Sequence, residues 1–304
     1  MLKFVGRNKR HSRLLIMEMA ERDSEIHNRR LIDIEQVIAG KSIRLLKIIP
    51  RFLVNYLKRV IHQDQLNEGL YRHRHLQGLE FVSAILKEYN VKIVVKGESN
   101  LLFAERFIAV ANHPLGGLDG MALMQEVGKF RKDIVVPSND FLMHLPNLRP
   151  LFIPINKHGS NAGNIAIFDT TFSSEKTMLY FPAGLCSRKI KGKIVDLEWK
   201  KTFLSKARKF NRDILPVHIS GRNSNFFYNL ANLRKWLGMK SNIEMLYLVD
   251  EMFRQDNKDI VITFGKPIPV STFDKRMNDV KWADRIREHV YKLESNPDAT
   301  FTFD

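Results

Sequence analysis

Cysteine is almost missing from this sequence of 304 residues, in which Cys186 is the only one. A single thiol excludes an internal disulfide bond, which fits a reducing compartment. No window approaches 18 apolar residues, so we expect no helix that spans a membrane. Residues 1–15 carry positive charge but no continuous apolar segment, so we expect no signal peptide. If the protein meets a membrane, we expect it to lie on the surface.

Acidic residues are scarce relative to basic ones. The chain has 49 Lys and Arg against 33 Asp and Glu, a formal net charge of +16. This excess indicates an anionic partner, which could be nucleic acid, an acidic membrane surface or an anionic substrate. A hydrophobic content of 44% is enough for a packed core and excludes a disordered chain.

Several kinds of binding motif are also missing. Neither GxxxxGK[ST] nor GxGxxG occurs, so nucleotide-binding loops are not expected. No helix-turn-helix, zinc or RNA-recognition motif is present, and the aromatic residues do not alternate with basic ones as stacking platforms, so nucleic acid is not the expected partner. The histidines are not spaced with cysteines or carboxylates as metal ligands, and no metal site is predicted.

Strands and helices alternate from residue 91 onward, which predicts an α/β fold with a mainly parallel sheet flanked by helices. We expect residues 1–85 to form a basic helical N-terminal extension and residues 86–304 to form the α/β domain. The predicted strands are 91–97, 106–112, 133–139, 151–156, 177–184, 213–221 and 259–269, and the predicted helices of the domain are 119–130, 160–173, 200–210 and 279–294.

The N-terminal extension contains a basic amphipathic segment, residues 41–61, in which Pro50 should kink or split the helix. Such a helix can rest in the headgroup layer of an anionic bilayer. The alternative is a helix that packs on the core and exposes a solvated basic face. A short helix at 31–40 and a second long helix at 66–89 are expected on either side.

The segment "ANHPLGGLDG", residues 111–120, follows the apolar run "RFIAV" and precedes a predicted helix. Asp119 at the helix start can be a simple N-cap. It can also hold the Nδ1–H of His113 and leave Nε2 as a general base. Amides of the turn with Gly116 and Gly117 could stabilise an oxyanion. The turn offers no nucleophile, and Cys186 fits an inert buried thiol better than a catalytic one, so a substrate hydroxyl or amine is expected to attack directly.

Three other segments are expected at the carboxyl ends of strands, where sites form in such sheets: "INKHG", "FPAGLCSR" and "ISGRNS". Arg149 and Lys157 stand at either end of an apolar strand. Arg188, which follows "FPAGLCS", begins a basic loop that can be a solvated face or can pair with phosphate or another anion.

Four blocks stand in a familiar order, "NHPLGGLD", "LFIPINK", "FPAGLCS" and "LPVHISG". Over about residues 90–270 the chain resembles the glycerolipid acyltransferase family of the lysophosphatidic-acid type. The resemblance implies that an acyl chain moves from acyl-carrier protein or coenzyme A to an acceptor, without a further cofactor. It implies that His113 takes the acceptor's proton and that Asp119 orients His113. The substrate-binding residues it implies are Asn112, Gly116, Gly117, Arg149, Lys157, Ala183, Gly184 and Arg188.

The chain departs from this family in two places. Five residues rather than four separate His113 and Asp119, an insertion that the glycine pair could absorb. In the "FPEGTRS" block, Ala183 replaces the acidic residue and Cys186 the arginine, so a phosphate-bearing acceptor is in doubt unless Arg188 substitutes.

The blocks "NHPLGGLDG" and "FPAG" resemble the haemolysin-like O-acyltransferases that complete ornithine or glycine aminolipids in bacteria, over about residues 40–270. This branch implies a 3-hydroxyacyl amino acid as acceptor, a lyso-ornithine or lyso-glycine lipid, and a peripheral location on the cytoplasmic face of an anionic membrane. The alternatives are a 1-acylglycerol-3-phosphate O-acyltransferase, a thioesterase in which water replaces the acceptor, an idle membrane scaffold and a basic nucleic-acid-binding protein.

Overall fold

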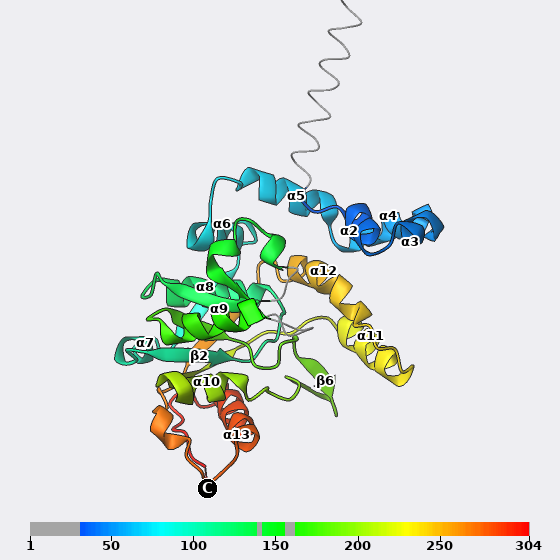
Figure 1. Ribbon diagram of the computed structural model, residues 1–304. Helices are drawn as coiled ribbons and strands as arrows, with labels where there is room; N and C mark the ends of the chain where they lie inside the picture. Colours follow the sequence, from blue (N-terminus) through cyan, green and yellow to red (C-terminus); the bar gives the residue numbers. More distant parts are fainter. Residues whose placement is uncertain (1–30, 139–141, 156–161, 304) are drawn as a thin grey trace, which may run out of the picture. The chain divides into compact units, whose positions relative to one another are not determined.

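The computed structural model describes residues 31–138, 142–155 and 162–303 (Figure 1). The chain divides into two compact units, one ending at Arg74 and the other beginning at His75. The domain boundary predicted from the sequence, at residues 85–86, falls inside helix α6 (Gly78–Glu88). That helix packs against α8 (Leu118–Gly128) in the second unit.

The first unit consists, in its described part, of short helices. Asp33 caps the first of them, because its Oδ1 accepts the amide of Glu35 at 2.8 Å. Pro50 splits the predicted helix 41–61 in two, as expected for a residue without an amide hydrogen. The helices are α2 (Ile34–Lys41), α3 (Ile43–Ile48), α4 (Arg51–Val60) and α5 (Gln63–Arg72).

The apolar residues of α3 and α4 divide between two environments. Val54 is buried with Ile34 and Ile38 in a small core, whereas Ile48 and Phe52 are 76% and 75% exposed. The segment therefore both packs inward and presents apolar side chains to its surroundings. Within the described ranges, no helix is long and apolar enough to cross a membrane.

The prediction of one helix over residues 66–89 is wrong, because α5 ends at Arg72 and α6 begins at Gly78. Gly78 has a φ of +57°, a left-handed conformation that interrupts a right-handed helix and that glycine adopts without a steric cost.

The second unit is built on a seven-stranded sheet of order β1-β9-β8-β2-β5-β3-β4. Strands β8, β2, β5, β3 and β4 run parallel, β9 is antiparallel to β8, and β1 is parallel to β9. The predicted α/β class with a mainly parallel sheet is confirmed. The strands are β1 (Lys92–Lys96), β2 (Phe107–Ala111), β3 (Ile134–Ser138), β4 (Phe152–Pro154), β5 (Thr177–Tyr180), β8 (Asp213–Ile219) and β9 (Asp259–Phe264).

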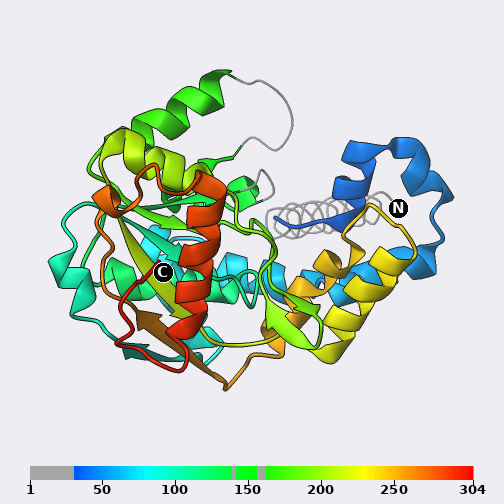
Figure 2. The ribbon, with the colours of Figure 1, turned by 90° about the horizontal axis from the view of Figure 1, so that it is seen from below.

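Helices cover both faces of this sheet (Figures 1 and 2). Helices α6 and α8 lie on one face, and α10 (Thr202–Phe210) and α13 (Asp279–Lys292) lie on the other. One core cluster joins the second pair of helices to the strands and includes Phe203, Trp282 and Met178, all fully buried. The helix α9 (Ala162–Ser173) contributes Phe172 to this core.

Several elements lie between the predicted ones. They are α7 (Asn100–Phe103), a two-stranded hairpin of β6 (Arg188–Ile190) and β7 (Lys193–Val195), α11 (Asn225–Trp236), α12 (Leu248–Phe253) and the short 3₁₀ helices η1 (Leu142–His144), η2 (Arg149–Leu151), η3 (Ile243–Tyr247) and η4 (Val270–Thr272). The hairpin and α11 stand directly after the strands that carry the candidate site, so they shape its surroundings.

Arg212 fastens the amino ends of the central strands, and its removal should destabilise the protein. Its buried guanidinium donates to the carbonyls of Phe172, Ser174 and Lys176. Arg212→Ala should lower the free energy of unfolding by about 3 kcal/mol, because the carbonyls lose their donors inside the protein. Urea denaturation followed by circular dichroism measures this. Arg208→Ala, which removes a partly exposed partner of Asp279, should cost at most about 1 kcal/mol. Equal losses in the two variants would contradict this role for Arg212.

Candidate active site

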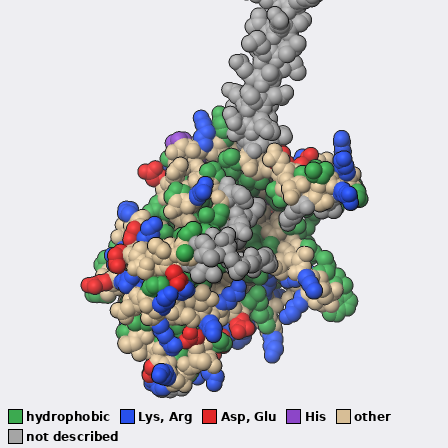
Figure 3. Space-filling model, viewed as in Figure 1, with side chains coloured by type: hydrophobic (Ala, Val, Ile, Leu, Met, Phe, Trp, Pro, Cys, Tyr) green, Lys and Arg blue, Asp and Glu red, His purple; other side chains and the backbone are tan. Residues whose placement is uncertain are grey.

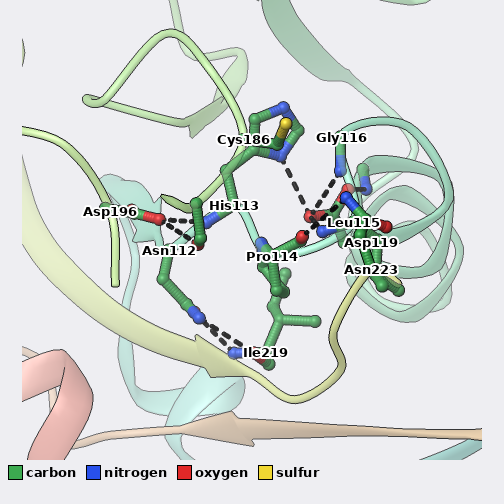
Figure 4. Close-up of polar contacts among 12 residues, drawn as sticks. Asn112, His113, Pro114, Leu115, Gly116, Asp119, Cys186, Asp196, Ile219 and Asn223 are labelled. Carbon is green, nitrogen blue, oxygen red and sulfur yellow. Dashed lines mark hydrogen bonds and ion pairs between the residues drawn. The ribbon is translucent and has the colours of Figure 1, made fainter. Parts of the chain in front are cut away.

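Asn112 connects the end of β2 to its neighbour β8. Its Nδ2 donates to the carbonyl of Ile219 at 2.8 Å, and its Oδ1 accepts the amide of Ile219 at 2.7 Å (Figure 4). The side chain is 2% exposed. Asn112 therefore fixes the loop that begins with His113, and both ends of its amide are engaged within the protein rather than directed to a substrate.

His113 and Asp119 contact each other as predicted, with 3.0 Å between Nδ1 and Oδ2. Asp119 lies in the first turn of α8 and is completely buried, and its Oδ2 also accepts the amides of Leu115 and Gly116, at 2.9 and 3.3 Å. Its Oδ1 accepts the amide of Gly120. Because the amides of Leu115 and Gly116 donate to this carboxylate, they are not directed to an oxyanion, and the oxyanion prediction is wrong for Gly116.

The glycine turn accommodates the fifth residue between His113 and Asp119. Gly116 has a φ of +84°, and a Cβ at this position would lie 2.9 Å from Leu248 and 3.2 Å from Cys186. Only glycine fits there without a rearrangement. Gly117 is exposed, and a Cβ there would meet nothing within 4 Å.

The imidazole of His113 stays accessible although its partner is buried. Its side chain is 16% exposed, compared with 0% for Asp119. The ring of Phe181, from the "FPAG" block, lies 4.5 Å from the imidazole between ring centres. The arrangement holds one ring nitrogen on a buried carboxylate while part of the side chain remains accessible.

Asp196 is a second buried carboxylate beside His113, and the sequence analysis missed it. Its Oδ1 accepts the backbone amide of His113 at 3.2 Å and the hydroxyl of Ser187 at 2.6 Å, while its Oδ2 accepts the indole N–H of Trp199. The amide of Ser187 in turn donates to the carbonyl of His113 at 2.8 Å. An acidic residue inside the apolar run "IVDLEW" was the available signal for it.

The electrostatics of the site favour a charged imidazole. Burial disfavours the imidazolium, but the charge of Asp119, its hydrogen bond and the charge of Asp196 outweigh this, so the pKa of His113 is raised above 6.5. For Asp119, burial favours the neutral acid, but the partnership with His113 and the backbone amides lowers its pKa. For Asp196 burial prevails over its hydrogen bonds and raises the pKa.

Arg188 is near the site but is engaged with protein groups. Its guanidinium is buried and pairs with Glu244 at 2.8 Å, and it also donates to the carbonyl of Cys186 at 2.6 Å. Its charge is close enough to lower the pKa of His113 slightly against the effect of Asp119. Arg188 therefore lies near His113, as predicted, but its charge is already paired with Glu244.

The remaining members of the "FPAGLCS" block lie at the carboxyl end of β5. Ala183 is buried in the core, whereas Gly184 is exposed, has a φ of +65° and has the Nζ of Lys200 3.7 Å from where its Cβ would be. Lys200 is an exposed cation that the sequence analysis overlooked. Its amide donates to the carbonyl of Pro182, which holds it beside this turn.

Cys186 is completely buried, and burial raises the pKa of its thiol to about 11 despite the nearby charge of Arg188. A thiol with this pKa is not ionised near neutral pH, so the structure favours the inert reading.

The structure does not bring Arg149 to the site. It stands in η2, directly before β4, while His113 follows β2. Because these strands run parallel in one sheet, Arg149 is at the amino edge and His113 at the carboxyl edge. Lys157 lies outside the described residues.

Comparison with known proteins identifies the class. The model of a family described as Acyltransferase matches residues 36–300, and the chain belongs to this family. It is therefore an acyltransferase. The chain is 46% identical, over 265 residues, to the lyso-glycine lipid O-acyltransferases of Bacteroides thetaiotaomicron and Phocaeicola vulgatus. The alignments cover 86% of this chain and 97% and 95% of those proteins, and the resemblance to aminolipid O-acyltransferases is confirmed.

Among solved structures, the 1-acyl-sn-glycerophosphate (LPA) acyltransferase PlsC from Thermotoga maritima is similar, with a TM-score of 0.45 and 18% sequence identity. The match covers 79% of this chain and 96% of that one.

The pairing of His113 with Asp119 should be visible in its titration. We expect the imidazole of His113 to titrate above pH 6.5 in the folded protein, and Asp119→Asn to move its pKa downward, because the charge is lost while burial remains. The pair then stabilises the fold fully between about pH 3.8 and pH 6.5. This contribution is lost as the pH rises through the folded-state pKa of His113, and also as the pH falls through the lowered pKa of Asp119.

Nuclear magnetic resonance of the imidazole nitrogens as a function of pH measures this, with the His113 signals assigned from a His113→Gln variant. Asp169→Asn is the control, since that carboxylate pairs with Lys206 and Lys209 and should leave the titration unchanged. A His113 pKa at or below 6.5, or one that ignores Asp119→Asn, would contradict the electrostatic account.

Proposed function

We propose that this protein transfers a fatty acyl chain from a thioester, acyl-ACP or acyl-CoA, to the hydroxyl of a lyso-glycine lipid. The observation that carries the proposal is the pair of His113 and buried Asp119, 3.0 Å apart, at the carboxyl edge of the sheet. The names of the two relatives, lyso-glycine lipid O-acyltransferase at 46% identity, support the choice of acceptor. A lyso-ornithine lipid is the related alternative within this class.

In the proposed reaction, His113 acts as the general base. Asp119 holds the Nδ1–H, so Nε2 accepts the proton of the acceptor hydroxyl while the oxygen attacks the thioester carbonyl. The resulting imidazolium is stabilised by Asp119, as the raised pKa of His113 indicates. The tetrahedral intermediate collapses with loss of the thiolate, which takes the proton back from His113. The products are an ester and a free thiol.

The charges around the site favour a carboxylate over a phosphate as the anionic group of the acceptor. A phosphate monoester needs several donors, and Arg188 is already committed to Glu244 and Cys186. Lys200, with Nζ beside Gly184, supplies one ammonium at the "FPAG" turn. A single ammonium matches the one carboxylate of an N-acylated glycine.

The proposed location is the cytoplasmic face of an anionic membrane, to which the protein binds peripherally. The net charge of +16 supports attraction to such a surface. The exposed side chains of Ile48 and Phe52, next to the exposed Lys47 and Arg51, support contact through the first unit.

The acceptor assay tests the function. We expect purified protein with labelled acyl-ACP or acyl-CoA to acylate N-(3-hydroxyacyl)glycine and not lysophosphatidic acid. His113→Ala should lower kcat by about 10²- to 10⁴-fold, the usual contribution of a general base. The labelled lipid product is separated by chromatography, and circular dichroism checks that the variant is folded.

Each other product would contradict a particular part of the proposal. Acylation of lysophosphatidic acid alone would show the wrong acceptor class, and free fatty acid as the only product with every acceptor would indicate a thioesterase. Absence of transfer to every acceptor would favour an idle scaffold. Full activity of the His113→Ala variant would contradict the assignment of His113 as the general base.

The role of Lys200 has a separate test. Lys200→Gln should raise KM for the glycine lipid roughly 10- to 100-fold, the value of a charge-assisted hydrogen bond, with kcat little changed. For an acceptor with a carboxamide in place of the carboxylate, Lys200→Gln should leave KM unchanged. Lys201→Gln is the matched control, since this neighbour is also exposed. Equal kinetics of the two variants would show that Lys200 does not bind the acceptor.

A further inference from the structure

Helix α11 is apolar on two sides, and only one of them is used by the fold. Phe227, Tyr228 and Ala231 are buried, the first two in a small cluster with Cys186. On another side, Phe226, Leu233 and Leu237 are 50%, 51% and 56% exposed. With Leu230 between them they recur at spacings of four, three and four residues, so they form one stripe along the helix.

The stripe continues to the end of the helix and beyond it. Trp236, the last residue of α11, is 80% exposed, and after the helix Met239 is 41% exposed and Leu246 on η3 is 43% exposed. Figure 3 shows hydrophobic side chains gathered where Figure 1 places α11, with Lys and Arg side chains beside them. We call this surface, formed by Phe226, Leu230, Leu233, Trp236, Leu237, Met239 and Leu246, the α11 ridge.

The surroundings of the α11 ridge are positive. No acidic residue occurs between Asp213 and Glu244, whereas Lys235 and Lys240 are exposed within this span. The β6–β7 hairpin packs against α11, where Asn232 donates to the carbonyl of Lys189, and it adds the exposed Lys191 and Lys193.

We propose that the α11 ridge is a second membrane-docking surface, which inserts its apolar side chains among the headgroups of an anionic bilayer. Exposed Trp, Phe and Leu rimmed by Lys are the composition of surfaces that lie in this interface. A second copy of the chain fits less well, because it would bring the same positive rim against its equivalent, whereas anionic headgroups complement it.

This surface adjoins the candidate active site. The hairpin begins at Arg188, next to Ser187, whose amide donates to the carbonyl of His113. Docking here would place the site at the lipid surface, where an acyl acceptor of the proposed kind resides. The biological use of the α11 ridge thus rests on the proposed function, but its binding to vesicles does not.

Trp236 provides a direct readout. The other tryptophans, Trp199 and Trp282, are 1% and 0% exposed, so a change in emission on membrane binding reports on Trp236. The full-length protein is mixed with vesicles of phosphatidylglycerol and brominated phosphatidylcholine. We expect a blue shift and quenching of the emission, both of which should be lost in Trp236→Phe. Vesicles of brominated phosphatidylcholine without phosphatidylglycerol should quench the emission less.

Vesicle co-sedimentation then measures the contribution of the stripe. Leu233→Ser with Leu237→Ser should lower the partition coefficient at least about tenfold, because two apolar side chains no longer leave water. Leu102→Ser with Phe103→Ser is the matched control, since these residues of α7 are 63% and 77% exposed in the same unit and should not contribute.

Three results would overturn the proposal. Sedimentation without quenching of Trp236 would mean that another surface, such as the helices of the first unit, carries all the binding. Equal quenching by neutral and anionic vesicles would show that the positive side chains around the α11 ridge do not contribute to membrane binding. A dimer in light scattering, with Trp236 emission already blue-shifted in solution, would mean that a second copy covers the ridge. None of these measurements involves acylation, so they stand apart from a failure of the proposed function.

Discussion

The bond between His113 and the buried carboxylate of Asp119 is the constraint around which the rest of the site is arranged. A charged group without exposure must be fully satisfied. Asp119 achieves this with one imidazole and three backbone amides. Two of the amides, those of Leu115 and Gly116, come from the turn that joins His113 to α8, and the third, that of Gly120, belongs to the first turn of α8. The shape of the turn, including the left-handed Gly116, follows from the need to direct these groups at one carboxylate.

Outside the turn, the position of His113 is set by its backbone. Asn112 ties it to β8, Asp196 accepts its amide, and Ser187 donates to its carbonyl. Two segments distant in the sequence, the ends of the β6–β7 hairpin and the end of β8, thus hold His113 and its neighbour Asn112 in place. The backbone of His113 is therefore held by hydrogen bonds on both sides, whereas Gly184 of the "FPAG" turn and Lys200 are exposed.

The sequence was informative wherever a local pattern determined the outcome. Alternating strands and helices predicted the sheet, and the segment from His113 to Asp119 predicted their contact, because both residues belong to one short turn. Asp196 and Lys200 were missed since their positions, beside His113 and Gly184, depend on the hairpin that precedes them in the sequence. Arg188 was recognised as a cation, but its partner Glu244 is 56 residues away, and the helix between them, α11, has no single apolar face that its sequence would reveal.

Glu244 is shared by two arginines, Arg188 beside the site and Arg234 on α11, each 2.8 Å from a different oxygen of the carboxylate. The buried carboxylate of Glu244 thus links the loop that supports His113 to helix α11, which carries the α11 ridge. The position of Arg234 on α11 and the neutralisation of Arg188 thus depend on the same anion. The helix with the α11 ridge and the cation whose charge lowers the pKa of His113 therefore share one buried carboxylate.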